Sequence, residues 1–227
     1  YTAHLSGQTE ILDIGLDASF IERAESSHFY HTAFEIKEIL RPRNKHTYKG
    51  NYGKAWFLAG SPETMGAALI AAESALRCGL GLLKVNVPEQ SFTAFNSKLP
   101  EAMLEARDLS RNKSWEEYQS VLAGPGLGKS EAAKEMLDLL IKKFKGPLVL
   151  DADALNLLAQ NPQWYSELGE HTLLSPHPGE FKRLLGINTL KADQLELAQE
   201  FSQRHQIFLL LKGAISVLIS PEGKMLF

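Results

Sequence analysis

Short apolar runs alternate with amphipathic stretches from about residue 54 to the end of the chain. Apolar runs bounded by turn residues are typical of buried strands, and apolar positions three or four apart are typical of helices. We therefore predict strands at 55–59, 82–87, 120–123, 148–150, 172–174 and 207–211. Helices are predicted at 65–77, 131–144, 153–159, 179–185 and 191–205. Apolar strands separated by helices predict an α/β protein with a mostly parallel sheet that is covered on both faces.

The two ends of the chain depart from this alternation. The apolar run 11–16 predicts a strand that belongs to a preceding unit, and the chain does not begin with Met, so we expect an upstream part. Residues 215–219 and 224–227 predict a hairpin around the turn 220–223. Because the chain ends inside the second strand of this hairpin, we expect the fold to continue beyond Phe227.

Composition narrows the class of protein. Hydrophobic residues make up 44% and charged residues 22%, which is typical of globular domains. A net charge of −3 provides no basic excess for binding nucleic acid. The chain lacks an apolar run of the ~18 residues that a membrane span needs, and its first residues do not resemble a signal peptide. We therefore expect a soluble cytoplasmic protein with no membrane partner, in which the single cysteine, Cys78, is a small core residue.

Ligands of parallel α/β sheets bind where the strands end and loops lead into helices. The loop 60–67 is rich in small residues, which let a ligand approach a helix N-terminus, and Ser61 is a candidate cap for that helix. The same loop is also compatible with an ordinary connection between a strand and a helix. Residues 123–130 fit a relaxed P-loop pattern. Residues 148–151 resemble the strand ending in Asp that accompanies a P-loop in nucleotide-binding proteins. Only 97 residues follow Ser130, which is short for a P-loop core, so this remains an alternative.

Charged side chains lie at three further strand ends. Asp151 could contact a ligand or a metal, whereas Asp153 suits the N-cap of the next helix, a structural role that we favour over a catalytic one. His177 lies between two prolines that fix its backbone, and structural and functional roles are equally compatible with that position. Lys212 precedes a glycine, so its ammonium group and the following amides could hold phosphate, or it could simply end a buried strand.

Six segments in order resemble one family, the ADP/ATP-dependent NAD(P)H-hydrate dehydratases, which are ribokinase-like enzymes. The segments are Lys49-Gly50…Gly53, Gly60-Ser61…Gly66-Ala67, Gly124-Pro125-Gly126-Leu127-Gly128, Asp151-Ala152-Asp153-Ala154-Leu155-Asn156, Pro176-His177-Pro178-Gly179-Glu180 and Leu211-Lys212-Gly213-Ala214. The resemblance runs from about residue 45 to Phe227 and implies a three-layer ribokinase-like fold. Residues 1–30 resemble the end of the epimerase domain that many bacteria fuse upstream, so we expect a dehydratase domain at 31–227, incomplete at its C-terminus, within a bifunctional protein.

The resemblance also implies a repair reaction. Family members remove water from the hydrates of NADH and NADPH, with ADP or ATP as the phosphoryl donor. Hydroxide is a poor leaving group, and phosphorylation of the ring hydroxyl makes it a good one, which fits a fold that positions phosphoryl groups. The phosphoryl chemistry leads us to expect Mg²⁺ with the nucleotide, although no cluster of metal ligands is evident in the sequence. The family commonly forms symmetric assemblies, so we expect a homo-oligomer.

The same resemblance assigns roles to individual residues. It implies that the substrate is bound by Ala67, Gly126 and His177, and the nucleotide by Lys212, Gly213, Ala214, Ile215 and Ser216. On this interpretation the P-loop match at Lys129 and Ser130 is accidental. The Gly-Ser-Gly-Asp segment of the family, whose Asp is the expected base, has no counterpart in these 227 residues. We therefore expect that Asp beyond Phe227 and this chain to be inactive or severely impaired. A small-molecule kinase of the same fold and a non-catalytic nucleotide-binding module remain alternatives.

Overall fold

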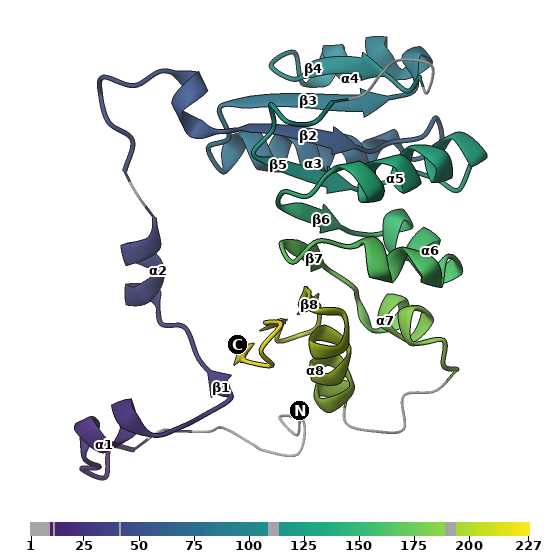
Figure 1. Cartoon of the computed structure of the whole chain (residues 1–227). Coiled ribbons are helices and arrows are strands. Elements are labelled where there is room, and N and C mark those ends of the chain that lie inside the picture. The colour runs from purple at the N-terminus through teal and green to yellow at the C-terminus, as the bar shows by residue number, and fades with distance from the viewer. Residues whose placement is uncertain (1–9, 11, 41, 109–113, 189–193) are drawn as a thin grey trace.

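The computed structural model describes residues 10, 12–40, 42–108, 114–188 and 194–227. Within them, strands form one sheet in the order β1-β10-β9-β8-β7-β6-β5-β2-β3-β4 (Figure 1). The strands are β1 (His28–Phe29), β2 (Lys54–Leu58), β3 (Leu82–Val87), β4 (Met103–Ala106), β5 (Ser120–Ala123), β6 (Leu148–Leu150), β7 (Thr172–Leu174), β8 (Phe208–Leu211), β9 (Val217–Ile219) and β10 (Met225–Leu226). All neighbouring strands are parallel except in the β8-β9-β10 meander, which confirms the predicted mostly parallel sheet.

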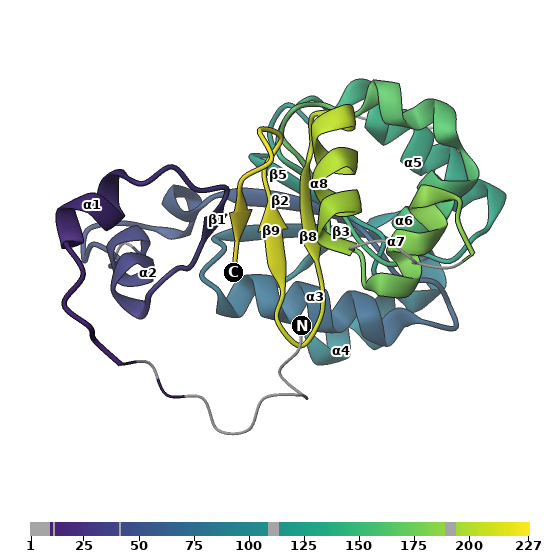
Figure 2. The same ribbon diagram turned by 90° about the horizontal axis from the view of Figure 1, so that it is seen from below.

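Helices lie on both faces of the sheet, so the predicted three-layer arrangement is confirmed (Figure 2). The α-helices are α1 (Ala18–Arg23), α2 (Ala33–Ile39), α3 (Met65–Arg77), α4 (Phe92–Lys98), α5 (Glu131–Lys143), α6 (Asp153–Gln160), α7 (Pro178–Leu185) and α8 (Gln194–His205). Short 3-10 helices are η1 (Lys49–Tyr52), η2 (Glu89–Ser91) and η3 (Pro162–Glu167). Helices α5 to α8 cover one face, and α3 and α4 cover the β2-β3 end of the other.

Side chains at alternate positions of the strands pack into two separate apolar cores, one on each face of the sheet. Leu150 and Leu209 pack into the larger core beneath α5 to α8, whereas Phe57 and Val85 pack with α3 and α4. On that second face, Val149 and its neighbours along the sheet are only partly buried, because α3 and α4 do not extend over β6 to β9. The alternation between buried and half-buried positions follows from the period of two along a strand.

Several local predictions differ from the structure. Residues 12–16 form no strand, and the side chains of Leu12 and Ile14 are 72% and 75% exposed; residue 11 lies outside the described residues. None of the strands in the described part of the chain pairs with residues 12–16. Cys78 is exposed at the end of α3 rather than in the core. The N-cap of α3 is Thr64, and Ser61 does not cap this helix. The predicted start of the last helix, at 191–193, also lies outside the described residues.

The first two helices lie apart from the layers of the domain, although the strand between them joins the sheet. Strand β1 pairs in parallel with β10, while α1 and α2 lie away from the body, on the side opposite to the carboxyl ends of β2 and β3 (Figure 1). Helices α1 and α2 bury no residue, and their apolar side chains Phe20 and Phe34 are exposed. None of the helices in the described part of the chain has the length and apolar character needed to cross a membrane.

Candidate functional site

The loops that follow β2 and β5 contact each other directly. The amide of Gly60 donates a hydrogen bond to Pro125 O (2.9 Å), and the Thr64 hydroxyl donates to Gly126 O (2.8 Å). Gly126 has φ +61°, and a Cβ there would lie 2.2 Å from Thr64 O and 3.1 Å from the Cβ of Ala67. Only glycine fits this conformation and this close approach. The structure therefore brings together Ala67 and Gly126, two of the three residues predicted to bind substrate.

The same loop after β5 also contacts the end of β6. A Cβ on Gly124 would lie 1.7 Å from Asp151 O, so the backbones of the two loops are in contact at this glycine. The amide of Gly128 donates to Asp153 Oδ2 (2.9 Å). The predicted N-cap role of Asp153 is wrong: the N-cap of α6 is Ala152, which has φ +49°, and its side chain makes no capping bond. A positive φ is strained for alanine, and such strain is concentrated at functional sites.

Lys212 and Asp151 form an ion pair at the ends of β8 and β6. The Lys212 ammonium lies 2.7 Å from Asp151 Oδ1, and the backbone amide of Lys212 donates to Pro176 O (2.9 Å). Both side chains are partly accessible, at 38% exposure for Lys212 and 29% for Asp151. The other residues predicted to bind nucleotide continue directly into the exposed connection to β9: Gly213, Ala214, Ile215 and Ser216.

His177 begins α7 as its N-cap. Its Nδ1 accepts hydrogen bonds from the amides of Gly179 (3.0 Å) and Glu180 (3.4 Å), and the buried Glu180 carboxylate accepts from the His177 amide in return. Because Nδ1 acts as an acceptor, the proton of the neutral imidazole is on Nε2. The ring is 52% exposed, and its Nε2 lies 3.5 Å from Glu180 Oε1. The structural role of His177 is thus clear, and its tautomer is fixed by the helix that it caps.

Arg107 supports the same edge of the sheet and was not singled out from the sequence. Its Nη2 donates to the carbonyls of Ala59 (2.6 Å), Gly60 (2.9 Å) and Asn86 (3.2 Å), at the ends of β2 and β3. Burial lowers the pKa of this guanidinium to about 10, which still leaves it charged at neutral pH. Arg107 follows the short strand β4, which was also not predicted. In the sequence, only one feature could have indicated Arg107: it directly follows a short, mostly apolar segment, and a single arginine at such a position is weak evidence for a site.

The described residues do not form a metal site of their own. No group of three or more His, Cys, Asp or Glu side chains converges within them, and the carboxylate of Asp151 is already paired. The P-loop alternative is also not supported. The hydroxyl of Ser130, which would face a metal in a P-loop, accepts from the Ala133 amide and caps α5. The amide of Gly128, which would face phosphate, donates to Asp153.

Comparison with known proteins places this chain in a family. A family model for NAD(P)H-hydrate dehydratase matches residues 55–227. The bifunctional NAD(P)H-hydrate repair enzyme Nnr of Moorella thermoacetica is 34% identical over 241 residues, covering 98% of this chain and 45% of that protein. The ADP-dependent (S)-NAD(P)H-hydrate dehydratase of Bacillus subtilis is 33% identical over 200 residues, covering 85% of this chain and 69% of that protein.

Solved structures support the same relationship. The ADP/ATP-dependent NAD(P)H-hydrate dehydratase of B. subtilis, co-crystallized with ATP/Mg²⁺, superposes with a TM-score of 0.74 at 31% identity, covering 87% of this chain and 71% of that one. A ribokinase-like protein of Enterococcus faecalis superposes with a TM-score of 0.79 at 22% identity and supports the fold alone, covering 89% of this chain and 72% of that one. The chain spans less than half the length of the bifunctional relatives. With the family match over residues 55–227 and the shared α/β architecture, the chain belongs to the ribokinase-like NAD(P)H-hydrate dehydratase family.

Proposed function

We propose that this chain binds the hydrates of NADH and NADPH and serves their dehydration to NADH and NADPH with ADP or ATP as phosphoryl donor. The observation that carries the proposal is that the predicted substrate and nucleotide residues all follow strands at one edge of the sheet. Ala67 and Gly126 follow β2 and β5, His177 follows β7, and Lys212 follows β8. Ligands of such sheets bind at this edge.

In this proposal the reaction proceeds through a phosphate ester. The hydroxyl oxygen of the hydrated nicotinamide ring bonds to the terminal phosphorus of the nucleotide, whose bond to the leaving AMP or ADP breaks. The carbon–oxygen bond of the ester then breaks, phosphate leaves, and the adjacent ring carbon loses a proton to restore the double bond. Catalysis of phosphoryl transfer depends mainly on positioning and on stabilising charge.

The residues of this chain contribute positioning and charge. Gly126 packs so closely against Thr64 and Ala67 that no larger side chain fits between the two loops. The Nε2–H group of His177 can donate a hydrogen bond to the substrate while Nδ1 continues to cap α7. The ammonium group of Lys212 and the exposed backbone of residues 213–216 would hold the nucleotide phosphates. The base that accepts the hydroxyl proton is assigned to an Asp beyond Phe227.

The domain assignment is part of the same proposal. Residues 31–227 would be the dehydratase domain, and residues 1–30 the end of an epimerase domain that precedes it in a bifunctional, homo-oligomeric repair enzyme. The bifunctional relatives, of which this chain covers less than half, support that assignment.

The deciding experiment measures the return of reduced-nicotinamide absorbance from NADH hydrate in the presence of ADP or ATP. Residues 1–227 are compared with the full gene product. We expect turnover by the full product and little or none by residues 1–227. Turnover by both would retain the function and refute the assignment of the base. A stable phosphorylated product from another small molecule would favour a kinase, and nucleotide binding without turnover by either would favour a silent binding module.

A matched pair of variants tests the substrate role of His177 separately from its capping role. Asn accepts hydrogen bonds from helix amides, whereas Ala does not. In the full gene product, His177→Asn and His177→Ala should both lower kcat/KM for the hydrate, but only His177→Ala should also lose about 1 kcal/mol of stability. If His177→Asn had the activity of the unmodified protein, the imidazole would have no part in substrate binding.

A further inference from the structure

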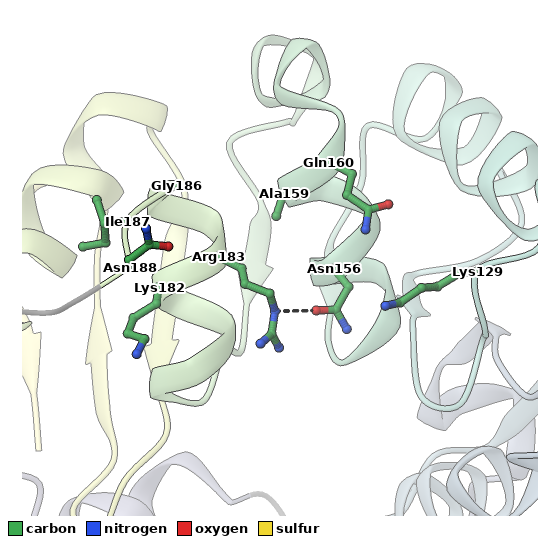
Figure 3. Close-up of a pocket in the computed structure, with 9 residues that line it drawn as sticks. All are labelled: Lys129, Asn156, Ala159, Gln160, Lys182, Arg183, Gly186, Ile187 and Asn188. Atoms are coloured by element: carbon green, nitrogen blue, oxygen red, sulfur yellow. Dashed lines mark hydrogen bonds between the residues drawn. The ribbon is translucent and has the colours of Figure 1, made fainter.

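One cavity is lined by residues that have no role in the proposed function so far. It has a volume of about 610 Å³ and lies between α6, α7 and the residues that follow the β5 loop. Figure 3 shows Lys129 and Arg183 on opposite sides of Asn156, with Lys182 on the other side of α7. The remaining lining residues of note are amides or apolar, and none of the described residues lining the cavity is acidic.

Three cations line this cavity, and one carboxylate, that of Asp153, lies behind the lining residue Asn156. Across the described residues, no ion pair to an acidic side chain involves Lys129, Lys182 or Arg183. A surface with neighbouring unpaired cations has a positive potential, which favours an anionic ligand over an uncharged one. Lysine and arginine are the side chains that bind phosphate groups, through charge-assisted hydrogen bonds.

The central arginine is held in place by a chain of hydrogen bonds. Arg183 Nε donates to Asn156 Oδ1 (2.8 Å), Asn156 Nδ2 donates to Asp153 Oδ1 (3.5 Å), and Asp153 Oδ2 accepts from the Gly128 amide (2.9 Å). This chain fixes the guanidinium through Nε, so its two terminal nitrogens remain for a ligand. It also connects the cavity to the loop that contains Gly126.

Two cations of the cavity follow closely in sequence after proposed substrate residues. Lys129 is three residues beyond Gly126, and Arg183 is six residues beyond His177, which is about 9 Å along a helix. Arg183 Nη1 lies 3.9 Å from the position that a Cβ on Gly179 would occupy, next to the cap of α7. In this arrangement a dinucleotide with its nicotinamide end near Gly126 and His177 would extend its other end toward this cavity.

We infer that this cavity binds the phosphate monoester on the adenosine ribose, the group that distinguishes NADPH hydrate from NADH hydrate. The inference rests on the proposed function and makes its substrate more specific. A phosphate monoester is close to a dianion at neutral pH and has three acceptor oxygens. Lys129 and the terminal nitrogens of Arg183 would bind it directly, and Lys182 would add to the attraction. The protein would then prefer NADPH hydrate.

Binding of two small probes tests the cavity without turnover. Adenosine 2′,5′-bisphosphate carries the ribose phosphate and 5′-AMP lacks it, so calorimetry on residues 1–227 should show the bisphosphate binding at least ten times more tightly. Lys129→Gln combined with Lys182→Gln should remove most of this preference. The matched control is Lys143→Gln, a lysine at the other end of α5, about 18 Å from the start of that helix, which should leave the preference unchanged. Equal binding of the two probes, or an equal loss in the control, would overturn the inference.

Two further measurements separate the possible sources of a phosphate. If the double variant weakens ADP binding as much as bisphosphate binding, the cavity serves the nucleotide cosubstrate and the inference is wrong. In the full gene product, kcat/KM for NADPH hydrate should exceed that for NADH hydrate, and the double variant should lower only the former. Turnover of both hydrates with no preference would overturn the inference but retain the function. Turnover of neither hydrate would refute the function, while the two probes would still test the cavity.

Discussion

Lys212 reaches past an intervening strand to pair with Asp151. Its Nζ lies 2.7 Å from Asp151 Oδ1, although β7 lies between the two strands that carry these residues. The backbone of Lys212 also bonds to Pro176 at the end of β7. The ends of three adjacent strands are thus connected by one lysine, which fixes the start of the proposed nucleotide loop.

The first prediction concerns nucleotide binding by Lys212. Lys212→Ala should weaken binding of ADP and ATP at least tenfold, because the ammonium group next to the loop is lost. The ion pair is partly exposed, so the free energy of unfolding should change by only about 1 kcal/mol or less. Titration calorimetry and urea unfolding measure the two effects. Lys129→Ala is the control and should leave ADP binding unchanged; a loss there instead would restore the P-loop interpretation.

The second prediction concerns the contact between the β2 and β5 loops. Gly126→Ala would place a Cβ 2.2 Å from Thr64 O at φ +61°, so the two loops must separate. The control is Gly186→Ala, which has a similar φ of +67° but no atom within 4 Å of the new Cβ. The control should cost about 1 kcal/mol for the backbone conformation alone. Gly126→Ala should cost clearly more and also weaken hydrate binding, and equal losses in urea unfolding would contradict the close approach.

The third prediction concerns the buried Arg107. Arg107→Lys retains a charge, but its single ammonium cannot also replace the contacts that the other guanidinium nitrogens make, Nε with Asn86 Oδ1 (3.4 Å) and Nη1 with Leu127 O (3.5 Å). We expect a loss of about 2–4 kcal/mol in the free energy of unfolding, measured by urea with an unchanged m value. Arg77→Lys is the control at an arginine whose side chain is 78% exposed, and it should have almost no effect. A similar small effect at position 107 would show that the carbonyls are satisfied without the guanidinium.

Apolar patterning predicted the central strands and most of the helices that cover them, because β2, β5 and β6 are largely buried and almost wholly apolar; α4 was not predicted. Where burial is incomplete the pattern fails. Strand β4 contains Glu105 and begins with the exposed Met103, so its run was not assigned. The apolar run 11–16 was assigned as a strand, but residues 12–16 have no partner strand in the described part of the chain.

For the site, the sequence predicted which loops take part but not which loops contact each other. Glycines, prolines and charged residues at strand ends marked the correct loops, because these residue types are needed where backbones approach closely. Which loops meet is a tertiary property: the contact of Gly126 with Thr64 joins residues 62 positions apart. The role of Asp153 was misjudged for a similar reason. Its sequence position suits a cap, but the positive φ of Ala152 and the amide of Gly128, distant in sequence, decide where its carboxylate bonds.

The last prediction concerns the pH dependence of stability. His205 stacks on Tyr165 and packs against Phe201, with ring centroids 4.6 Å apart in each case. Burial, and secondarily the nearby Arg204, lowers the pKa of His205 from its ordinary value of 6.5. As the pH falls below about 6.5, the unfolded chain therefore binds a proton that the folded chain does not, and the free energy of unfolding decreases.

The stability that depends on the neutral His205 imidazole is fully present above about pH 6.5, and it is lost as the pH falls toward the pKa of His205 in the folded protein. The stability difference between the unmodified protein and His205→Gln should therefore shrink between about pH 7.5 and about pH 5.5. Arg204→Gln retains the imidazole and removes the secondary cause, so its pH dependence should lie between those of the other two proteins. Urea unfolding across the range gives the free energies, and an NMR titration of the imidazole gives the folded pKa. A stability difference that is independent of pH would show that His205 is no more difficult to protonate in the folded protein than in the unfolded chain, so that burial against the two rings does not restrict its charge.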